Sequence, residues 1–162
     1  MSQVHSIPAS LNLVLPDADA TVRLAHKLSP LLRPGDAVLL SGPVGAGKTH
    51  FARSLIQRRL GTGEDVPSPT FTLVQTYGPP EAEIWHADLY RLSHPDEVWE
   101  LGLDDAFQTA ICLVEWPDRL GRHQPEGALH IHLSVADEGR LAMMTGGRVG
   151  LLTDLAVALS DE

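Results

Sequence analysis

The sequence predicts a single α/β domain built in three layers, with helices on both faces of a mixed, mainly parallel sheet. Strand-like and helix-like patterns alternate early, a glycine-rich loop joins an apolar run to a helical pattern, and a hairpin pattern comes late. Of the 162 residues, 43% are hydrophobic, which is ordinary for a globular domain with one core. No linker-like stretch divides the chain, so one domain is expected over residues 1–162.

The first half of the chain is predicted to alternate two strands with two helices. Asp17 is a typical N-cap residue, and the apolar residues after it recur at helical spacing until the Arg-Pro-Gly-Asp segment at 33–36. The continuous apolar run at 37–42 is typical of a buried parallel strand. The expected elements are a strand at 11–15, a helix after Asp17, a strand at 37–42, and a helix that follows the glycine-rich loop and ends at Gly61 and Gly63.

The second half is predicted to be richer in strands. Ser93 is expected to open a short helix, with Asp96 completing a capping box. The Asp-Glu-Gly turn at 137–139 predicts an antiparallel hairpin between the last two strands. The amphipathic tail is expected to form a helix, and no role is assigned to residues from about 146 to 162. The expected strands are 71–77, 83–90, 110–116, 128–135 and 140–146.

The glycine-rich loop carries the strongest functional signal. Residues 42–49 match the pattern G-x-x-x-x-G-K-[ST], in which glycines let backbone N–H groups approach phosphate oxygens. Lys48 can reach the β- and γ-phosphates, and the Thr49 hydroxyl can bind Mg²⁺. A plain glycine-rich turn would leave this Lys-Thr pair unexplained, so the sequence predicts a P-loop NTPase fold. The expected nucleotide contacts are Gly42, Val44, Gly45, Ala46, Gly47, Lys48 and Thr49.

Two acidic residues are candidates for the carboxylate that a magnesium site needs. Asp88 and Glu115 each end a predicted strand, and ligands of open α/β sheets bind beyond the carboxyl ends of the strands. These residues alone leave the choice open. Glu115 is favoured as the metal ligand because its strand is the more apolar one. Asp88 would then orient the attacking water or act as a base, and strand periodicity places it on one face with His86.

Charge and cysteine content restrict the setting in which the protein works. The formal net charge is −9, so the chain is a poor candidate for binding nucleic acid by itself. Cys112 is the single cysteine, which excludes an internal disulfide and fits a reducing compartment. No apolar run is long enough to cross a bilayer, and the N-terminus lacks the pattern of a signal peptide. A cytoplasmic protein without membrane attachment is expected.

Three further motifs follow the P-loop in the order Ser-Pro-Thr-Phe-Thr-Leu-Val (68–74), His-Ala-Asp-Leu-Tyr-Arg-Leu (86–92) and Leu-Val-Glu-Trp-Pro-Asp-Arg-Leu (113–120). Together the four motifs resemble the TsaE family, also called YjeE, over residues from about 15 to 135. The resemblance implies a Mg²⁺-dependent ATPase, weak in isolation, of tRNA N6-threonylcarbamoyladenosine synthesis at position 37. It also implies ATP and Mg²⁺ as cofactors, a TsaB–TsaD pair as partner, and tRNA contact only through that pair.

The resemblance also implies roles for individual residues. Lys48 would bind the phosphates, Thr49 and Glu115 would hold Mg²⁺, and Asp88 matches an acid that the family requires. The segment Ser-Pro-Thr-Phe-Thr is a switch-like loop. The remaining implied contacts are Thr70 near the γ-phosphate, Trp116 beside the metal-site glutamate, and Ala18 and Thr21 near the adenine. Departures from the family pattern are Ala87 and Pro43-Val44, and neither touches a proposed chemical role.

Two other functions share the same P-loop. A small-molecule kinase would carry an arginine-rich lid over the transferred phosphate, which the sequence lacks. A nucleotide-dependent binding switch would signal through ATP binding rather than turnover. Among the isolated signals, Arg91 is expected to lie over the strand edge more often than on phosphate. His130 and His132 have metal-ligand spacing without a third ligand, so a solvated strand face is favoured.

Overall fold

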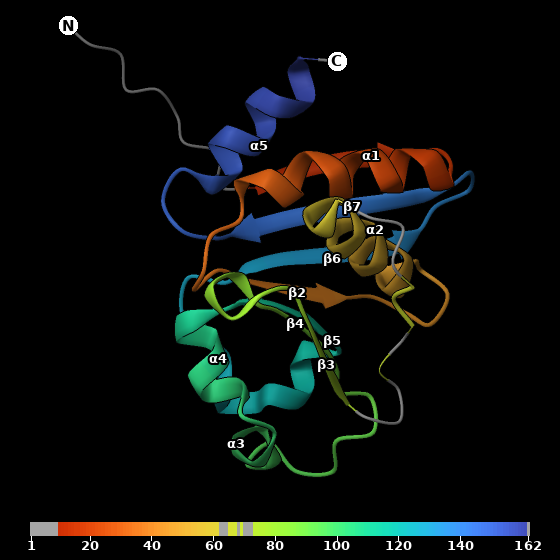
Figure 1. The fold of residues 1–162 in the computed structure, drawn as a ribbon. Helices are drawn as coiled ribbons and strands as arrows, with labels where there is room; N and C mark the ends of the chain where they lie inside the picture. Colours follow the sequence, from red (N-terminus) through yellow and green to blue (C-terminus); the bar gives the residue numbers. More distant parts are fainter. Residues whose placement is uncertain (1–9, 62–64, 68, 70–72, 162) are drawn as a thin grey trace, which may run out of the picture.

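The computed structural model describes residues 10–61, 65–67, 69 and 73–161. In this part of the chain, seven strands form one sheet in the order β1-β7-β6-β2-β5-β4-β3 (Figure 1). The strands are β1 (Ser10–Leu15), β2 (Ala37–Ser41), β3 (Val74–Tyr77), β4 (Ile84–Asp88), β5 (Ile111–Glu115), β6 (Leu129–Val135) and β7 (Arg140–Gly146).

The centre of the sheet is parallel. Strands β6, β2, β5 and β4 are neighbours that all run in one direction, and in this register Val38 lies between Leu113 and Leu129. Strands β3 and β7 run the opposite way, and β1 pairs antiparallel with β7. Five of the seven described strands therefore share one direction. The predicted mixed, mainly parallel sheet is confirmed, and so is the hairpin formed by β6 and β7.

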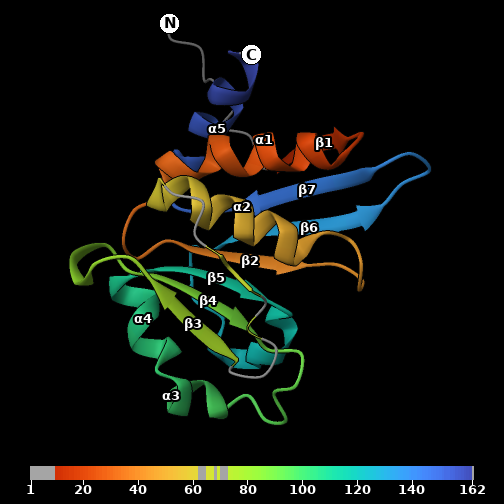
Figure 2. The ribbon, with the colours of Figure 1, turned by 45° about the vertical axis from the view of Figure 1, so that its right-hand side comes forward.

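Helices cover both faces of the sheet. On one face lie α1 (Ala18–Leu28), α2 (Lys48–Leu60) and α5 (Leu151–Ser160), and on the other lie α3 (Glu97–Leu101) and α4 (Leu103–Thr109) (Figures 1 and 2). Side chains of β2 alternate between the two layers. Val38 and Leu40 belong to the apolar cluster under α1 and α2, whereas Leu39 belongs to the cluster under α4. The predicted three-layer architecture is confirmed.

The helix-boundary signals near the N-terminus act as predicted. The Asp17 carboxylate accepts a 2.8 Å hydrogen bond from the N–H of Ala20 and caps α1. Gly61 ends α2 in the left-handed conformation. Gly63 lies outside the described residues. The tail helix is also confirmed, because α5 buries Leu151 and Leu155 against the core.

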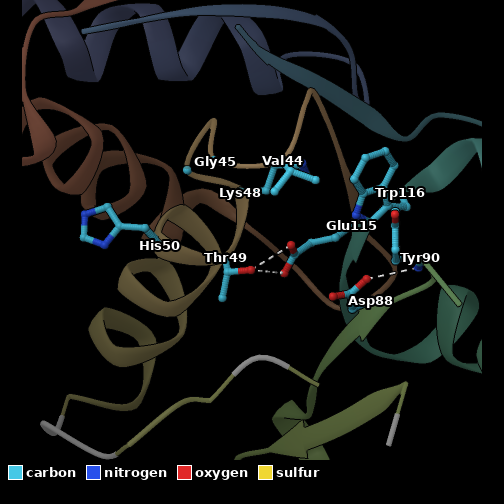
Figure 3. Close-up of a pocket in the computed structure, with 10 residues that line it drawn as sticks. Val44, Gly45, Lys48, Thr49, His50, Asp88, Tyr90, Glu115 and Trp116 are labelled. Atoms are coloured by element: carbon cyan, nitrogen blue, oxygen red, sulfur yellow. Dashed lines mark hydrogen bonds between the residues drawn. The ribbon is translucent and has the colours of Figure 1, made fainter. Parts of the chain in front are cut away.

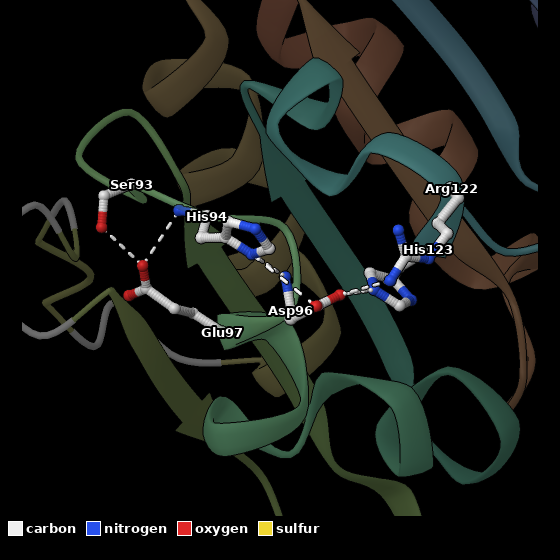
Figure 4. A network of polar contacts seen from close by, with 6 residues as sticks. All are labelled: Ser93, His94, Asp96, Glu97, Arg122 and His123. Atoms are coloured by element: carbon white, nitrogen blue, oxygen red, sulfur yellow. Dashed lines mark hydrogen bonds and ion pairs between the residues drawn. The ribbon is translucent and has the colours of Figure 1, made fainter.

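The capping box expected at Ser93 is wrong. The helix begins at Glu97, and its N-cap residue Asp96 makes no capping bond with its side chain. Glu97 instead accepts hydrogen bonds from the Ser93 hydroxyl at 2.5 Å and from the His94 N–H at 2.9 Å (Figure 4). The glutamate therefore organises the turn before α3, a role that the serine was expected to have.

Asp96 joins α3 to the 3₁₀ segment η3 (Pro117–His123). Its carboxylate accepts hydrogen bonds from Arg122 at 2.9 Å and from His123 at 2.8 Å (Figure 4). The hydrogen bond from His123, with the Arg122 charge beside it, holds the pKa of Asp96 below its usual range. This polar network fixes α3 against the segment that follows β5.

Part of the sheet lies open to solvent. His130 and His132 are exposed on β6, and the His132 Nδ1 lies 2.8 Å from the Ser41 hydroxyl. In the residues the structure describes, no cluster of three or more His, Cys, Asp or Glu side chains could hold a metal ion. The exposure of both side chains agrees with the interpretation of this part of β6 as a solvated strand face. Within the same residues, no helix is both long and apolar enough to cross a membrane.

Candidate functional site

A cavity of about 610 Å³ lies at the carboxyl ends of the parallel strands β2, β4 and β5. Figure 3 shows that the P-loop and the first turn of α2 form one wall, while the ends of β4 and β5 form the other. This is the edge at which open α/β sheets bind ligands. The lining residues are Val44, Gly45, Gly47, Lys48, Thr49, His50, Asp88, Tyr90, Glu115 and Trp116.

The P-loop depends on glycine at two positions with positive φ, and at one of them a side chain would also clash. Gly42 has φ of 135°, and a Cβ atom there would lie 2.1 Å from the carbonyl oxygen of Leu133. Gly47 has φ of 103° and is the N-cap of α2. The helix therefore begins without a side-chain cap, and its first N–H groups remain directed at the cavity. Such a helix N-terminus has a positive potential that favours an anion.

Lys48 lies against the loop that precedes it. Its ammonium donates to the carbonyl oxygens of Gly42 at 2.6 Å and Pro43 at 2.9 Å, and it lies 4.3 Å from the centre of the Trp116 ring. The residue is only 5% exposed. Burial lowers the pKa of Lys48, and the nearby Glu115 and Asp88 carboxylates oppose that effect. An anion in the cavity would meet a cation that is already desolvated and positioned.

Glu115 is the polar centre of the site. Its carboxylate accepts a hydrogen bond from the Thr49 hydroxyl, with oxygen–oxygen distances of 2.8 and 3.0 Å. The Nε2 atom of His86 lies 2.7 Å from Oε2 of the same carboxylate. The other ring nitrogen, Nδ1, is buried and has no hydrogen-bond partner among the described residues. His86 is therefore assigned as a donor to the Glu115 carboxylate through Nε2–H, since a carboxylate oxygen is an acceptor.

Asp88 enters the same cavity from the neighbouring strand. It lies opposite Glu115 in the parallel register of β4 and β5, and Figure 3 shows both carboxylates facing the cavity. One Asp88 oxygen accepts a 3.1 Å hydrogen bond from the N–H of Tyr90. The structure thus brings together the two acidic residues predicted from the sequence. The hydroxyl of Thr49 contacts Glu115, which is the arrangement expected of a pair of metal ligands.

Trp116 has an unusual backbone conformation. Its φ and ψ are 60° and 54°, a left-handed conformation that is rare for a bulky residue. Its N–H donates to the carbonyl of Leu40, and its ring lies 5.0 Å from that of Tyr90. The side chain is half-buried and lines the cavity, so it faces the space where a ligand would lie.

A second cavity of about 390 Å³ adjoins the first and lies between the P-loop and the start of α1. Ala18 and Thr21 line this second cavity, and Gly47 and His50 line both. Arg140, the first residue of β7, closes one side of it. The guanidinium donates to the carbonyl oxygens of Gly45 at 3.0 Å and Ala46 at 3.3 Å.

Several residues of the site were not predicted from the sequence. His50 and Arg140 carry no motif that points to a ligand, and Arg140 is distant from the P-loop in sequence. His86 was placed on the same strand face as Asp88, but its contact with Glu115 depends on the pairing of two strands. Arg91 is exposed and does not line either cavity. Thr70 lies outside the described residues.

The three-layer sheet, the P-loop and the adjacent hydroxyl–carboxylate pair define a nucleotide-binding protein of the P-loop class. Residues 15–142 match the family described as "Threonylcarbamoyl adenosine biosynthesis protein TsaE". The chain therefore belongs to the TsaE family, which takes part in the synthesis of threonylcarbamoyladenosine in tRNA. This finding confirms the resemblance that the four sequence motifs indicated.

Individual relatives agree with this assignment. The chain is 39% identical over 128 residues to a tRNA threonylcarbamoyladenosine biosynthesis protein TsaE of Rickettsia felis, covering 79% of this chain and 75% of the relative. It is 35% identical to the protein of the same name in Haemophilus influenzae, covering 81% and 86%. A crystal structure of Bacillus subtilis YdiB superposes with a TM-score of 0.77 at 25% identity, covering 97% of this chain and 99% of that one.

Proposed function

We propose that this protein hydrolyses ATP with Mg²⁺ as a component of the machinery that makes N6-threonylcarbamoyladenosine at position 37 of tRNA. The observation that carries the proposal is the Thr49–Glu115 contact at the P-loop, with Asp88 facing the same cavity. A protein that only cradled phosphate would not need two buried acids beside it. Buried carboxylates are costly unless a cation or hydrogen bonds compensate them.

The described residues fit a magnesium–nucleotide complex. The Thr49 hydroxyl and Glu115 carboxylate would hold Mg²⁺, which would neutralise phosphate charge when bound. The loop N–H groups and the start of α2 would bind the phosphates. Lys48 would leave the carbonyl oxygens of Gly42 and Pro43 and bind the β- and γ-phosphates, because phosphate is the stronger acceptor for an ammonium.

Asp88 is the residue we assign to the attacking water. Its carboxylate lies at the end of β4, beside Glu115, and is held by the N–H of Tyr90. From that position it would accept a proton or a hydrogen bond from water aligned with the γ-phosphate. Glu115 cannot serve in the same way because Thr49 and His86 already bind its oxygens.

Family membership supports the choice of partner, and the net charge of the chain supports an indirect contact with tRNA. We assign a TsaB–TsaD-type complex as the partner, a cytoplasmic location, and indirect contact with tRNA. A chain with a net charge of −9 is poorly suited to bind the tRNA phosphates alone. Hydrolysis would then drive a conformational cycle of the complex, with weak turnover in the isolated protein.

The small-molecule kinase gains no support from the structure. Among the described residues that line the first cavity, Lys48 is the only lysine or arginine. A phosphoryl-transfer enzyme would use further cations to clamp the transferred group. A pure binding switch would not require Asp88 to face the phosphates.

ATP hydrolysis by the purified protein, alone and with TsaB–TsaD, tests this proposal. We expect Mg²⁺-dependent turnover that the partner stimulates, and a loss of about 100-fold or more in the Asp88→Asn variant. Glu115→Gln should raise the Mg²⁺ requirement. Glu126→Gln changes an exposed glutamate and should leave turnover unchanged. Turnover that is independent of Asp88 and Glu115 would refute the assignment of the site.

A further inference from the structure

His50 has an unused polar atom at the junction of the two cavities. It follows Thr49 on α2, and its Nε2 is buried without a hydrogen-bond partner in the described part of the chain. Figure 3 shows the imidazole on the side of α2 that faces away from Glu115. A buried nitrogen without a partner is destabilising, so such an atom in a cavity wall indicates a ligand contact.

The surroundings of His50 leave space for a ligand group beside the ring. The second cavity is floored by small residues, Ala18 and Gly47, which leave room beside the ring. Its other strong donor, Arg140, is already bound to the loop carbonyl oxygens of Gly45 and Ala46. The capping carboxylate of Asp17 is likewise engaged with Ala20. Among the described residues that line this cavity, His50 has a buried ring nitrogen without a hydrogen-bond partner.

The order of groups along a nucleotide matches the order of the two cavities. The phosphates belong in the first cavity, against the loop N–H groups and Lys48. The rest of the nucleotide can continue into the second cavity, past the shared residues Gly47 and His50. The group that links the phosphates to the base is the ribose. It would therefore lie beside His50.

We infer that His50 Nε2 forms a hydrogen bond with a ribose hydroxyl of the bound nucleotide and so makes the site selective for nucleotides over inorganic polyphosphate. This inference rests on the proposed function, because it requires the first cavity to bind phosphates. It gives the second cavity a chemical role as the nucleoside half of the site. The contact is a binding interaction and takes no part in the hydrolysis step.

Calorimetric titration with ADP and with pyrophosphate, both with Mg²⁺, tests the contact without turnover. We expect His50→Ala to weaken ADP binding by about 10-fold while leaving pyrophosphate binding unchanged. His50→Gln, which keeps a donor, should retain most of the ADP affinity, and His50→Phe, which keeps only the ring, should not. His130→Ala removes an exposed histidine of β6 and is the matched control.

A second ligand identifies the group that His50 contacts. In the wild-type protein, 2′,3′-dideoxy-ADP should bind about 10-fold more weakly than ADP, and in His50→Ala the two ligands should bind equally. Equal losses of ADP and pyrophosphate binding in His50→Ala would overturn the inference. It would also be overturned if removing the ribose hydroxyls weakened binding by the same factor in His50→Ala as in the wild-type protein. If the wild-type protein bound neither ADP nor pyrophosphate, the proposed function itself would fail. Pyrophosphate binding by each variant also shows that its P-loop is intact.

Discussion

The imidazole Nε2 of His86 lies 2.7 Å from the Oε2 atom of Glu115, and the two side chains are 0% and 2% exposed. They come from adjacent parallel strands, β4 and β5, whose pairing sets this distance. Thr49 contacts the same carboxylate from α2. The buried histidine thus fixes the orientation of the glutamate that we propose as the magnesium ligand, much as outer partners orient ligands in other metal sites.

Removing this support should weaken the proposed metal site while the P-loop stays intact. We predict that His86→Ala lowers the apparent Mg²⁺ affinity by about 10- to 100-fold, measured by titrating Mg²⁺ against ATP turnover. His86→Gln can still donate to the carboxylate and should recover part of the affinity. A His86→Ala protein with an unchanged Mg²⁺ dependence would show that the contact has only a structural role.

Nucleotide binding should change the environment of Trp116. The Lys48 ammonium lies 4.3 Å from the ring centre, and phosphate should draw it away. We predict that ADP changes the tryptophan fluorescence of the wild-type protein and that Trp116→Phe removes nearly all of this change. Trp99 is 58% exposed and packs against His123, outside the first cavity, so Trp99→Phe should preserve the response. A fluorescence response that persisted in Trp116→Phe and disappeared in Trp99→Phe would contradict the proposed movement of Lys48.

Arg140 should act on phosphate binding from outside the motif. Its guanidinium holds the carbonyl oxygens of Gly45 and Ala46. Because the C=O and N–H of one peptide group point in opposite directions, the N–H of Gly47 points away from Arg140. We predict that Arg140→Ala weakens pyrophosphate and ADP binding equally, by about 10-fold, in calorimetric titrations. Arg140→Lys should lose less, and Arg122→Ala, far from the loop, should lose nothing. A loss confined to ADP would instead place Arg140 on the nucleoside.

The Asp96 network should make stability depend on pH at the acidic end. Because hydrogen bonding lowers the pKa of Asp96 in the folded protein, its stabilising contribution is present above the ordinary carboxyl pKa and is lost as pH falls through the folded value. We predict that Asp96→Asn lowers Tm at pH 6 and that the gap to wild type narrows below a pH of about 4. A gap that was as large well below pH 4 as at pH 6 would argue against a charged network.

Local patterns predicted most of the fold. Several elements are each determined by a pattern of only a few residues. Examples are the apolar runs of β2 and β5, the N-cap at Asp17 and the glycine at the end of α2. The predicted capping box does not form because both of its residues have other partners. The Ser93 hydroxyl donates to Glu97 instead. The Asp96 carboxylate accepts hydrogen bonds from Arg122 and His123. Sequence spacing alone does not reveal such competition.

The site was predictable to the extent that it is built from motifs. The P-loop and the two strand-end acids could be identified because strand ends meet at one edge of a parallel sheet. The contact of His86 with Glu115 and the contact of Arg140 with the loop arise from strand order and hairpin placement. Neither depends on residues that are close in sequence, so no local pattern could indicate them.

The level of threonylcarbamoyladenosine at position 37 of tRNA tests the central claim most directly. It would be measured by mass spectrometry of tRNA nucleosides in cells that are depleted of this protein and then supplied with a variant. The account predicts that the modification falls on depletion and returns with the wild-type protein and with Lys27→Ala, which changes the other of the two lysines. It also predicts no recovery with Lys48→Ala. A normal level after depletion in cells without a redundant copy, or full recovery with Lys48→Ala, would contradict the account.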